Sequence, residues 1–239
     1  MVDAGRIRGV LFDLDGTLID SAPDLAGAAN LLRADHGLEP LPLDSLRPWV
    51  GSGARGMVGA AFGVVPGESR FEALRDAFLA HYAAGLLQRT QPFDGVDAML
   101  YALDTSGIPW GIVTNKATRF TTPIVAGLGL LQRATVVVCG DTTAHSKPHP
   151  EPLWHAARAM GLPPEDVVYV GDDLRDAQAA RAAGMRMVAA TWGYLGQGQP
   201  VNEWGADALA ATPEHLHAWL CERLVQPKGP TGVYRPTSR

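Results

Sequence analysis

Several polar side chains able to bind a metal or do catalysis stand directly after short apolar runs in this sequence. They are Asp13 and Asp15, Thr114 and Asn115, and Asp172, Asp173 and Asp176, and Lys147 lies a few residues beyond a fourth run. If they meet in one crevice, five carboxylates would repel one another strongly unless a cation lies among them. Oxygen ligands without histidine or cysteine favour a hard ion. A site that also admits an anionic substrate is typical of Mg²⁺.

The same residues could handle a phosphate group. The Thr114 hydroxyl and the backbone N–H groups of the turn from Asp13 to Gly16 can cradle a tetrahedral oxyanion, and Lys147 adds a fixed positive charge. One aspartate could attack phosphorus, and a second, two residues further on, could protonate the leaving alcohol and then activate water. A polar turn alone would explain Asp13 and Asp15, and a helix N-cap alone would explain the acids at 172–176. Neither explains the whole set of residues together. We therefore expect phosphoryl transfer to a carboxylate.

The apolar runs before these residues have the pattern of strands buried on both faces. They cover residues 7–12, 110–113, 135–139 and 167–170, with a weaker candidate at 185–190. Helical patterns lie between them at 96–103, 119–128, 151–160 and 176–183. This alternation predicts an α/β fold with a doubly wound, Rossmann-like parallel sheet. The loops at the carboxyl ends of such strands converge on one crevice, so the polar clusters should be neighbours.

Residues 21–90 interrupt the alternation. They contain helix patterns at 24–36 and 71–87 but no convincing strand, and the segment is far longer than a crossover needs. We predict that it is an inserted helical domain. The α/β core would then consist of residues 1–20 and 91–226.

Two short connections, 18–21 and 88–94, would join the insertion to the core and could act as a hinge. The C-terminal residues 227–239 carry prolines and glycines without apolar periodicity, which predicts a flexible tail.

Composition narrows the classes of partner. Twenty Lys and Arg against 25 Asp and Glu give a net charge of −5, the wrong sign for a chain that binds nucleic acid through its phosphates. The apolar stretch after Arg8 is interrupted at once by Asp13, so it can neither form a signal peptide nor span a membrane. Cys139 and Cys221 have no spacing typical of a disulfide framework or zinc site. We expect a cytoplasmic protein with a small-molecule partner and no nucleic-acid or membrane partner.

The motifs together resemble those of haloacid dehalogenase superfamily phosphatases. The first motif is matched by residues 13–18 (DLDGTL), the second by Thr114-Asn115, the third by Lys147-Pro148, and the fourth by Gly171-Asp172-Asp173 with Asp176. The four occur in the family's order, and the resemblance runs from about residue 7 to residue 218.

The resemblance implies a role for each matching position. Asp13 would be the nucleophile and a metal ligand, and Asp15 the general acid and base, with its backbone carbonyl on the metal. Thr114, Asn115, Lys147 and Gly16 would hold the phosphate, and Asp172 would bind Mg²⁺. Asp176 would orient metal-bound water or Lys147. Many relatives carry serine at the position of Asp173, which would either support the metal ligands or have no role.

The insertion resembles the helical cap that closes over the crevice in this family. Its glycine-rich segment 50–55 resembles the cap loop that points into the site, so Arg55 is a candidate to bind a substrate carboxylate. A solvated surface arginine is the alternative. Gly51, Gly53 and Gly56 also spell the GxGxxG pattern of dinucleotide-binding folds, but no convincing strand precedes them.

Two histidines four residues apart, His145 and His149, have the spacing of metal ligands on one helix. Pro148 and Pro150 disfavour a helix there, so we predict that both lie in a loop. A role for His145 at the rim of the substrate site stays open.

Within the family, several stretches are most similar to phosphoglycolate phosphatases and also resemble phosphatases of N-acetylmuramic acid 6-phosphate. We predict a Mg²⁺-dependent phosphomonoester hydrolase acting on a small acidic metabolite, with phosphoglycolate as substrate and N-acetylmuramic acid 6-phosphate as the alternative. A phosphosugar mutase and a non-catalytic binding module are further alternatives. The presence of both Asp13 and Asp15 speaks against the binding module. The oligomeric state is not indicated by the sequence.

Overall fold

The computed structural model describes residues 7–225, and a six-stranded sheet forms its centre. The strands, in spatial order, are β5 (Val136–Val138), β4 (Trp110–Val113), β1 (Gly9–Phe12), β6 (Val167–Gly171), β7 (Arg186–Ala190) and β8 (Ala208–Ala210). All adjacent pairs are parallel. The chain proceeds outward from β1 in both directions, which confirms the predicted doubly wound α/β class.

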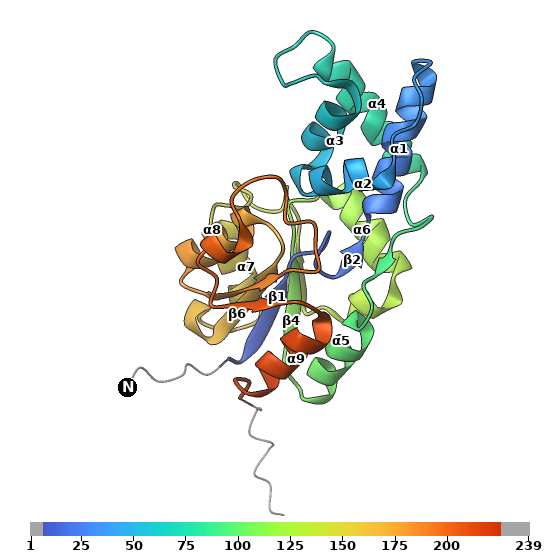
Figure 1. Cartoon of the computed structure of the whole chain (residues 1–239). Coiled ribbons are helices and arrows are strands. Elements are labelled where there is room, and N and C mark those ends of the chain that lie inside the picture. Colours follow the sequence, from blue (N-terminus) through green and yellow to red (C-terminus); the bar gives the residue numbers. More distant parts are fainter. Residues whose placement is uncertain (1–6, 226–239) are drawn as a thin grey trace, which may run out of the picture.

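Helices cover both faces of the sheet, which is why the strands read as continuous apolar runs. Along β1, Val10 and Phe12 join the hydrophobic cluster on one face and Leu11 joins the cluster on the other. The first cluster includes residues of α5 (Val96–Thr105), α6 (Thr118–Gly127) and α9 (Pro213–Cys221). The second includes residues of α7 (Glu151–Ala159) and α8 (Leu174–Ala183). Figure 1 shows α7 and α8 on the opposite side of the strands from α5 and α9.

A helical insertion stands apart from these layers, at the top of Figure 1. It consists of α1 (Ala22–Asp35), α2 (Leu43–Leu46), a 3₁₀ turn (Arg47–Ser52), α3 (Gly53–Phe62) and α4 (Phe71–Ala84). Their buried side chains, such as Leu32, Val58 and Phe78, form a separate hydrophobic cluster, which Phe120 and Tyr194 of the core join. The predicted class of an α/β core with inserted helices is therefore confirmed, whereas the exact domain boundaries stay a prediction.

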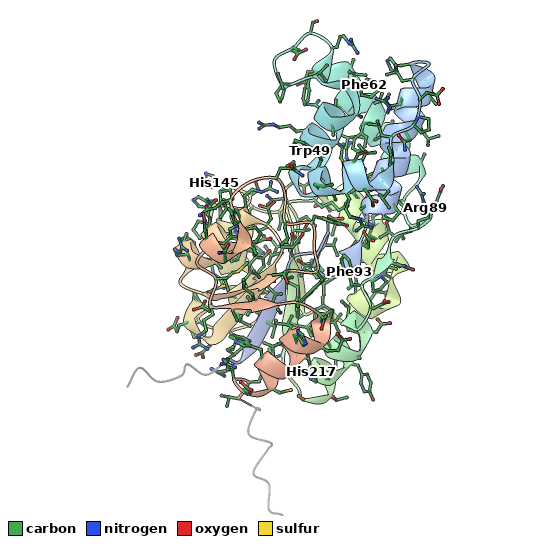
Figure 2. The ribbon with its side chains drawn as sticks, in the orientation of Figure 1. Trp49, Phe62, Arg89, Phe93, His145 and His217 are labelled. Atoms are coloured by element: carbon green, nitrogen blue, oxygen red, sulfur yellow. The ribbon has the colours of Figure 1, made fainter. Side chains whose placement is uncertain are left out.

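The two connections between core and insertion lie side by side. They form the short strands β2 (Ile19–Asp20) and β3 (Gln91–Pro92), which pair antiparallel. Asp24, at the start of α1, accepts hydrogen bonds from the backbone N–H groups of Arg89 and Thr90 at 2.9 Å each. Figure 2 labels Arg89 and Phe93 along this second connection.

Several elements differ from the sequence prediction. α1 begins at Ala22, two residues before the predicted start, because proline is favourable in the first helical turn and Pro23 lies there. Strand β8 and helix α9 were missing from the prediction, although Thr212 caps α9 through its side chain and Pro213 begins it. Those two residue types in that order are a helix-start signal that the sequence carries.

The glycine-rich segment predicted as a loop forms the 3₁₀ turn and the first turn of α3, so Arg55 lies on a helix. The predicted tail, 227–239, lies outside the described residues. Among residues 7–225, every helix is too short or too polar to cross a membrane.

Candidate active site

The carboxyl ends of the central strands and the helical insertion enclose a cavity of about 350 Å³. Eight of the ten residues predicted for the site line it: Asp13, Asp15, Thr114, Asn115, Lys147, Asp172, Asp173 and Asp176. Gly16 lies behind Asp172, and Arg55 lines a separate hollow. In Figure 2, Trp49 of the insertion and His145 of the core lie near the edges where the two parts face each other.

Asp13 is the first residue after β1. Its backbone N–H donates to the Val170 carbonyl at 2.8 Å. This hydrogen bond to β6 fixes the position of the Asp13 backbone and therefore of its Cβ atom. The carboxylate lies 2.9 Å from Lys147 Nζ and accepts a hydrogen bond from the Leu14 N–H at 2.8 Å. Burial raises the pKa of Asp13 to about 7; Lys147 opposes this rise, and the nearby carboxylates add to it.

The turn after Asp13 holds Asp172. Gly16 has a φ of +85°, and a Cβ at this position would lie 2.1 Å from Asp172 Oδ2, so the turn requires glycine. Thr17 Oγ1 donates to Asp172 Oδ1 at 2.9 Å, and the Tyr194 N–H donates to Oδ2 at 2.8 Å. Burial, followed by the charges of Asp13 and Asp176, raises the pKa of Asp172 well above its usual value. In the structure Gly16 supplies room for Asp172, and its contact with phosphate stays a prediction.

Lys147 is the buried cation of the site. Its ammonium nitrogen lies 2.9 Å from Asp13 Oδ1 and 2.7 Å from Asp176 Oδ1. It also donates to the Val113 carbonyl at 3.0 Å and to the Tyr169 hydroxyl at 2.7 Å. Burial by itself would lower the pKa of Lys147, but the two carboxylates raise it overall. The ammonium therefore stays charged between the ends of β1, β4 and β6.

Asn115 positions the Lys147 loop. Its side-chain amide donates to the Lys147 carbonyl at 2.8 Å, and its amide oxygen accepts the Lys147 N–H at 2.9 Å. Thr114 is buried one residue earlier, where its N–H donates to the Val138 carbonyl at 2.9 Å. The Thr114 side chain lines the cavity, whereas the Asn115 side chain is engaged with the backbone of the lysine loop.

Asp15 is paired with a lysine that the sequence analysis did not assign to the site. Lys116 Nζ donates to both carboxylate oxygens of Asp15, at 2.9 and 3.1 Å, and the Ser21 hydroxyl donates to the same carboxylate. Burial by itself would lower the pKa of Lys116, but Asp15 raises it overall. The sequence could have indicated that Lys116 belongs to the site, because it directly follows Thr114 and Asn115, two predicted site residues.

Asp173 and Asp176 cap α8. Asp173 accepts a hydrogen bond from the Arg175 N–H at 2.9 Å, and Asp176 accepts one from the Asp173 N–H at 3.1 Å, which completes a capping box. The helix-cap reading of this segment is thus correct, and it coexists with the placement of both acids in the cavity. Asp176 additionally holds Lys147.

Arg175 is a second residue that the sequence analysis missed. Its guanidinium contacts Asp173 through Nε at 2.7 Å and through Nη2 at 2.9 Å, and Nη2 also donates to the Gly51 carbonyl. Burial would raise the pKa of Asp173, but its bonds with Arg175 lower it overall. Arg175 therefore links the core to the glycine-rich turn of the insertion.

Arg55 does not share the cavity with Asp13. It is exposed in the first turn of α3 and lines a hollow with Trp49 and Val65, on the other side of Arg175. Asp173 and Arg175 line both this hollow and the cavity, so Arg55 lies next to the edge of the cavity without lining it.

The two histidines lie in the loop before α7, as predicted. Their rings stack with centroids 4.2 Å apart, and His145 Nδ1 lies 2.8 Å from Glu151 Oε2. Both side chains are exposed.

Three carboxylates of the site could share a metal ion. Asp13, Asp172 and Asp176 each bring an oxygen atom within 4.8 Å of the others. Lys147 contacts two of these carboxylates but not the third, so negative charge is in excess. Oxygen donors in such a cluster fit a hard divalent cation. The Asp15 side chain is bound to Lys116 instead, and the predicted metal contact of its backbone carbonyl stays a prediction.

Comparison with known proteins agrees with this geometry. The model of the family described as haloacid dehalogenase-like hydrolase matches residues 10–190. This chain belongs to that family. The match covers β1 to β7 and includes all four motifs.

Curated relatives cover nearly the whole chain. A phosphoglycolate phosphatase of Xanthomonas campestris is 49% identical over 87% of this chain and 94% of its own length. An N-acetylmuramic acid 6-phosphate phosphatase of Pseudomonas aeruginosa is 42% identical over 88% and 93%. A solved structure titled a predicted phosphoglycolate phosphatase, from Haemophilus somnus, has a TM-score of 0.78 and 28% identity over 89% of this chain and 97% of its own. The chain is accordingly a phosphatase of the haloacid dehalogenase family.

Proposed function

We propose that this phosphatase hydrolyses small phosphate monoesters with Asp13 as the nucleophile. The observation that supports this most is the position of the Asp13 carboxylate, which lines the cavity at 2.9 Å from the Lys147 ammonium. Attack of a carboxylate oxygen on phosphorus forms an aspartyl phosphate and releases the alcohol; water then breaks the acyl phosphate and restores Asp13. Lys147 and Thr114 bind the transferring phosphate oxygens, and Asn115 positions Lys147.

Asp15 is proposed to give a proton to the leaving alcohol and later to take one from water. It stands two residues after Asp13 and lines the same cavity. Lys116 and Ser21 fix the orientation of its carboxylate. This support matters because a general acid must lie within hydrogen-bond reach of the leaving oxygen.

Mg²⁺ is the proposed cofactor, held by Asp13, Asp172 and the backbone carbonyl of Asp15, with Asp176 and Asp173 supporting the site from behind. When bound, it would neutralise charge on the phosphate oxygens. The support is the cluster of carboxylate oxygens around the carboxyl ends of β1 and β6.

The helical insertion is proposed to act as a cap over the phosphate site, with residues 18–21 and 88–94 as its hinge. It contributes an apolar wall to the cavity, which includes Leu25, Val50 and Leu79. We also propose a cytoplasmic location, in keeping with the free thiols of Cys139 and Cys221.

Phosphoglycolate is the proposed substrate, supported by the 49% identity to the phosphatase of X. campestris. N-acetylmuramic acid 6-phosphate is the second candidate. The specific observation in its favour is the cavity of about 350 Å³ with an apolar wall, which a two-carbon acid would leave partly empty.

Two experiments test these proposals. Asp13→Asn should reduce Mg²⁺-dependent release of phosphate from phenyl phosphate by at least about 10³-fold, because it removes the nucleophile. Asp97→Asn, an exposed carboxylate on α5, should leave the rate unchanged. Full activity of Asp13→Asn would exclude Asp13 as nucleophile.

The substrate is tested by kcat/KM for phosphoglycolate, N-acetylmuramic acid 6-phosphate and hexose phosphates. A preference for phosphoglycolate would support the first candidate, and a preference for the amino sugar would replace it with the second. Isomerisation of β-glucose 1-phosphate without release of phosphate would indicate a mutase instead.

A further inference from the structure

Two histidines and a glutamate gather at the surface beside the loop that carries Lys147. His145 and His149 stand on either side of Lys147 in the chain, and Glu151 begins α7. Each of the three offers one ligand atom, and these atoms lie within 4.8 Å of one another. In the described part of the chain, the other group of three or more ligands this close together is the carboxylate cluster of the active site.

Both histidine rings direct a nitrogen atom toward Glu151. His145 Nδ1 lies 2.8 Å from Glu151 Oε2. The Glu151 N–H donates to His149 Nδ1 at 3.2 Å, so this nitrogen carries a lone pair and not a proton. Such a lone pair is what a neutral imidazole offers to a metal ion. The proton between His145 and Glu151 is the one that a bound cation would displace.

An ion from solvent can reach all three side chains. The side chain of His145 is 60% exposed and that of Glu151 is 36% exposed, and His149 is exposed as well. The two histidines line a hollow of their own, and neither they nor Glu151 line the cavity around Asp13. A metal ion here would therefore not compete with a substrate for space.

The side chains need a modest adjustment to share one ion. Two ligand atoms about 2.1 Å from a tetrahedral zinc ion lie about 3.4 Å apart, so the pair of His145 and Glu151 must open slightly. The two imidazole rings stack with their planes 25° apart, and one must turn before both lone pairs can meet. Rotation about the Cβ–Cγ bond of histidine is soft, and these rings are at the surface. Pro148 and Pro150 restrict the backbone, which keeps the histidines together while their rings turn.

The donor set differs from that of the carboxylate cluster. Two imidazole nitrogens and a carboxylate oxygen suit Zn²⁺, Co²⁺, Ni²⁺ and Cu²⁺, whereas Mg²⁺ prefers oxygen ligands. A zinc ion with three protein ligands completes its tetrahedron with water. The exposure of the group leaves room for that water.

We propose that His145, His149 and Glu151 form a binding site for a transition-metal cation of the zinc type. The bound ion ties the loop that carries Lys147 to the start of α7. This site is separate from the Mg²⁺ site proposed at Asp13, and it does not depend on the proposed function.

Calorimetric titration of Zn²⁺ into the untagged full-length protein, with excess Mg²⁺ present, tests the proposal. The wild type should bind Zn²⁺. His149→Ala and Glu151→Gln should each bind it at least about 10-fold more weakly, because each loses a ligand. His155→Ala is the matched control, since it removes an exposed histidine of α7 outside the group, and the affinity should change less than about two-fold.

Two further variants report on competing sites. Cys221 Sγ lies 3.4 Å from His217 Nε2 on α9, and this pair could also attract Zn²⁺. Asp172→Asn weakens the carboxylate cluster in the same experiment. Both His217→Ala and Asp172→Asn should keep the wild-type affinity. Loss of binding in either of them while His149→Ala binds normally, or no binding by the wild type, would overturn the proposal.

Amide hydrogen exchange tests the tie between the loop and α7. Saturating Zn²⁺ should slow exchange within residues 145–151 of the wild type and leave His149→Ala unaffected, because the ion restrains the loop only when its ligands are present. Unchanged exchange in zinc-bound wild type would overturn the tie. Neither experiment measures catalysis, so both give an answer whether or not Asp13 is the nucleophile.

Discussion

At the scale of residues, the site depends on how each carboxylate is paired. Asp13 and Asp176 share Lys147, Asp15 is held by Lys116, and Asp173 is held by Arg175. The contacts of Asp172 are two neutral donors, the Thr17 hydroxyl and the Tyr194 N–H. Asp172 is therefore the carboxylate with most to gain from a bound cation.

Mg²⁺ should accordingly stabilise the wild-type protein through Asp172. We expect the melting temperature to rise by a few degrees with millimolar Mg²⁺, about 2–4 °C for each kcal/mol of binding free energy. In Asp172→Asn, the ligand-free protein should be at least as stable, because one buried charge is removed, and the rise with Mg²⁺ should disappear. Differential scanning calorimetry with and without Mg²⁺ measures both effects. An undiminished rise in Asp172→Asn would remove this residue from the metal site.

Lys116 should affect catalysis through Asp15. Lys116→Met removes the ammonium that orients the Asp15 carboxylate, and we expect kcat to fall about 10- to 100-fold for alkyl phosphates. Alkyl alcohols are poor leaving groups that need protonation, so p-nitrophenyl phosphate, whose leaving group needs none, should be affected less. Equal losses on the two classes of ester would show that Lys116 acts on the fold or on substrate binding instead. A thermal unfolding curve of the variant serves as the control for folding.

At the scale of elements, the start of α1 is fastened to the second connection. Asp24 is buried and accepts hydrogen bonds from the N–H groups of Arg89 and Thr90 and from the Thr90 hydroxyl. This single carboxylate therefore holds the two connections, which run through β2 and β3, side by side.

Asp24→Ala should lower the free energy of unfolding by about 2–4 kcal/mol, because it leaves buried backbone N–H groups unpaired. Asp35→Ala, an exposed residue at the other end of the same helix that pairs with His81, should cost less than about 1 kcal/mol. Urea denaturation measures the two values. A loss for Asp24→Ala no larger than that for Asp35→Ala would mean that the connections are held by β2 and β3 alone.

At the scale of the whole molecule, Arg175 joins the core to the helical insertion. It lies between Asp173 of the core and the Gly51 carbonyl of the insertion, at one edge of the cavity. The insertion also covers the cavity with apolar side chains, and Tyr82 and Phe120 contact each other across the boundary between the two parts. The wall of the cavity is thus shared between the core and the insertion.

Arg175→Met should weaken this closed arrangement. We expect KM for the preferred ester to rise about 3- to 10-fold with a smaller effect on kcat, since binding is affected more than the chemical step. Arg55→Met is the matched control, because Arg55 lies on the insertion outside the cavity, and its KM should change less than about two-fold. A larger effect at Arg55 would restore its predicted contact with the substrate and show that the Gly51 contact has little importance.

The sequence by itself determined the strand motifs and the chemistry of their ends. Asp13, Thr114 and Asp172 directly follow apolar runs, and such runs are local patterns that a parallel sheet must bring to one edge. The α/β class and the inserted helices followed from the same reading. The short β8 and the helix α9 were missed because they are brief and lack a long periodic pattern.

Only the tertiary structure decided which side chains meet. The pairing of Lys116 with Asp15 and the contact of Arg175 with Gly51 both join residues that lie far apart in the chain. Arg55 lines another hollow for the same reason, because the glycine-rich segment coils into a helix whose first turn directs it there, and its contact with a substrate carboxylate stays a prediction. Periodicity fixes the face on which a side chain lies, but the packing of one element against another fixes what that face contacts.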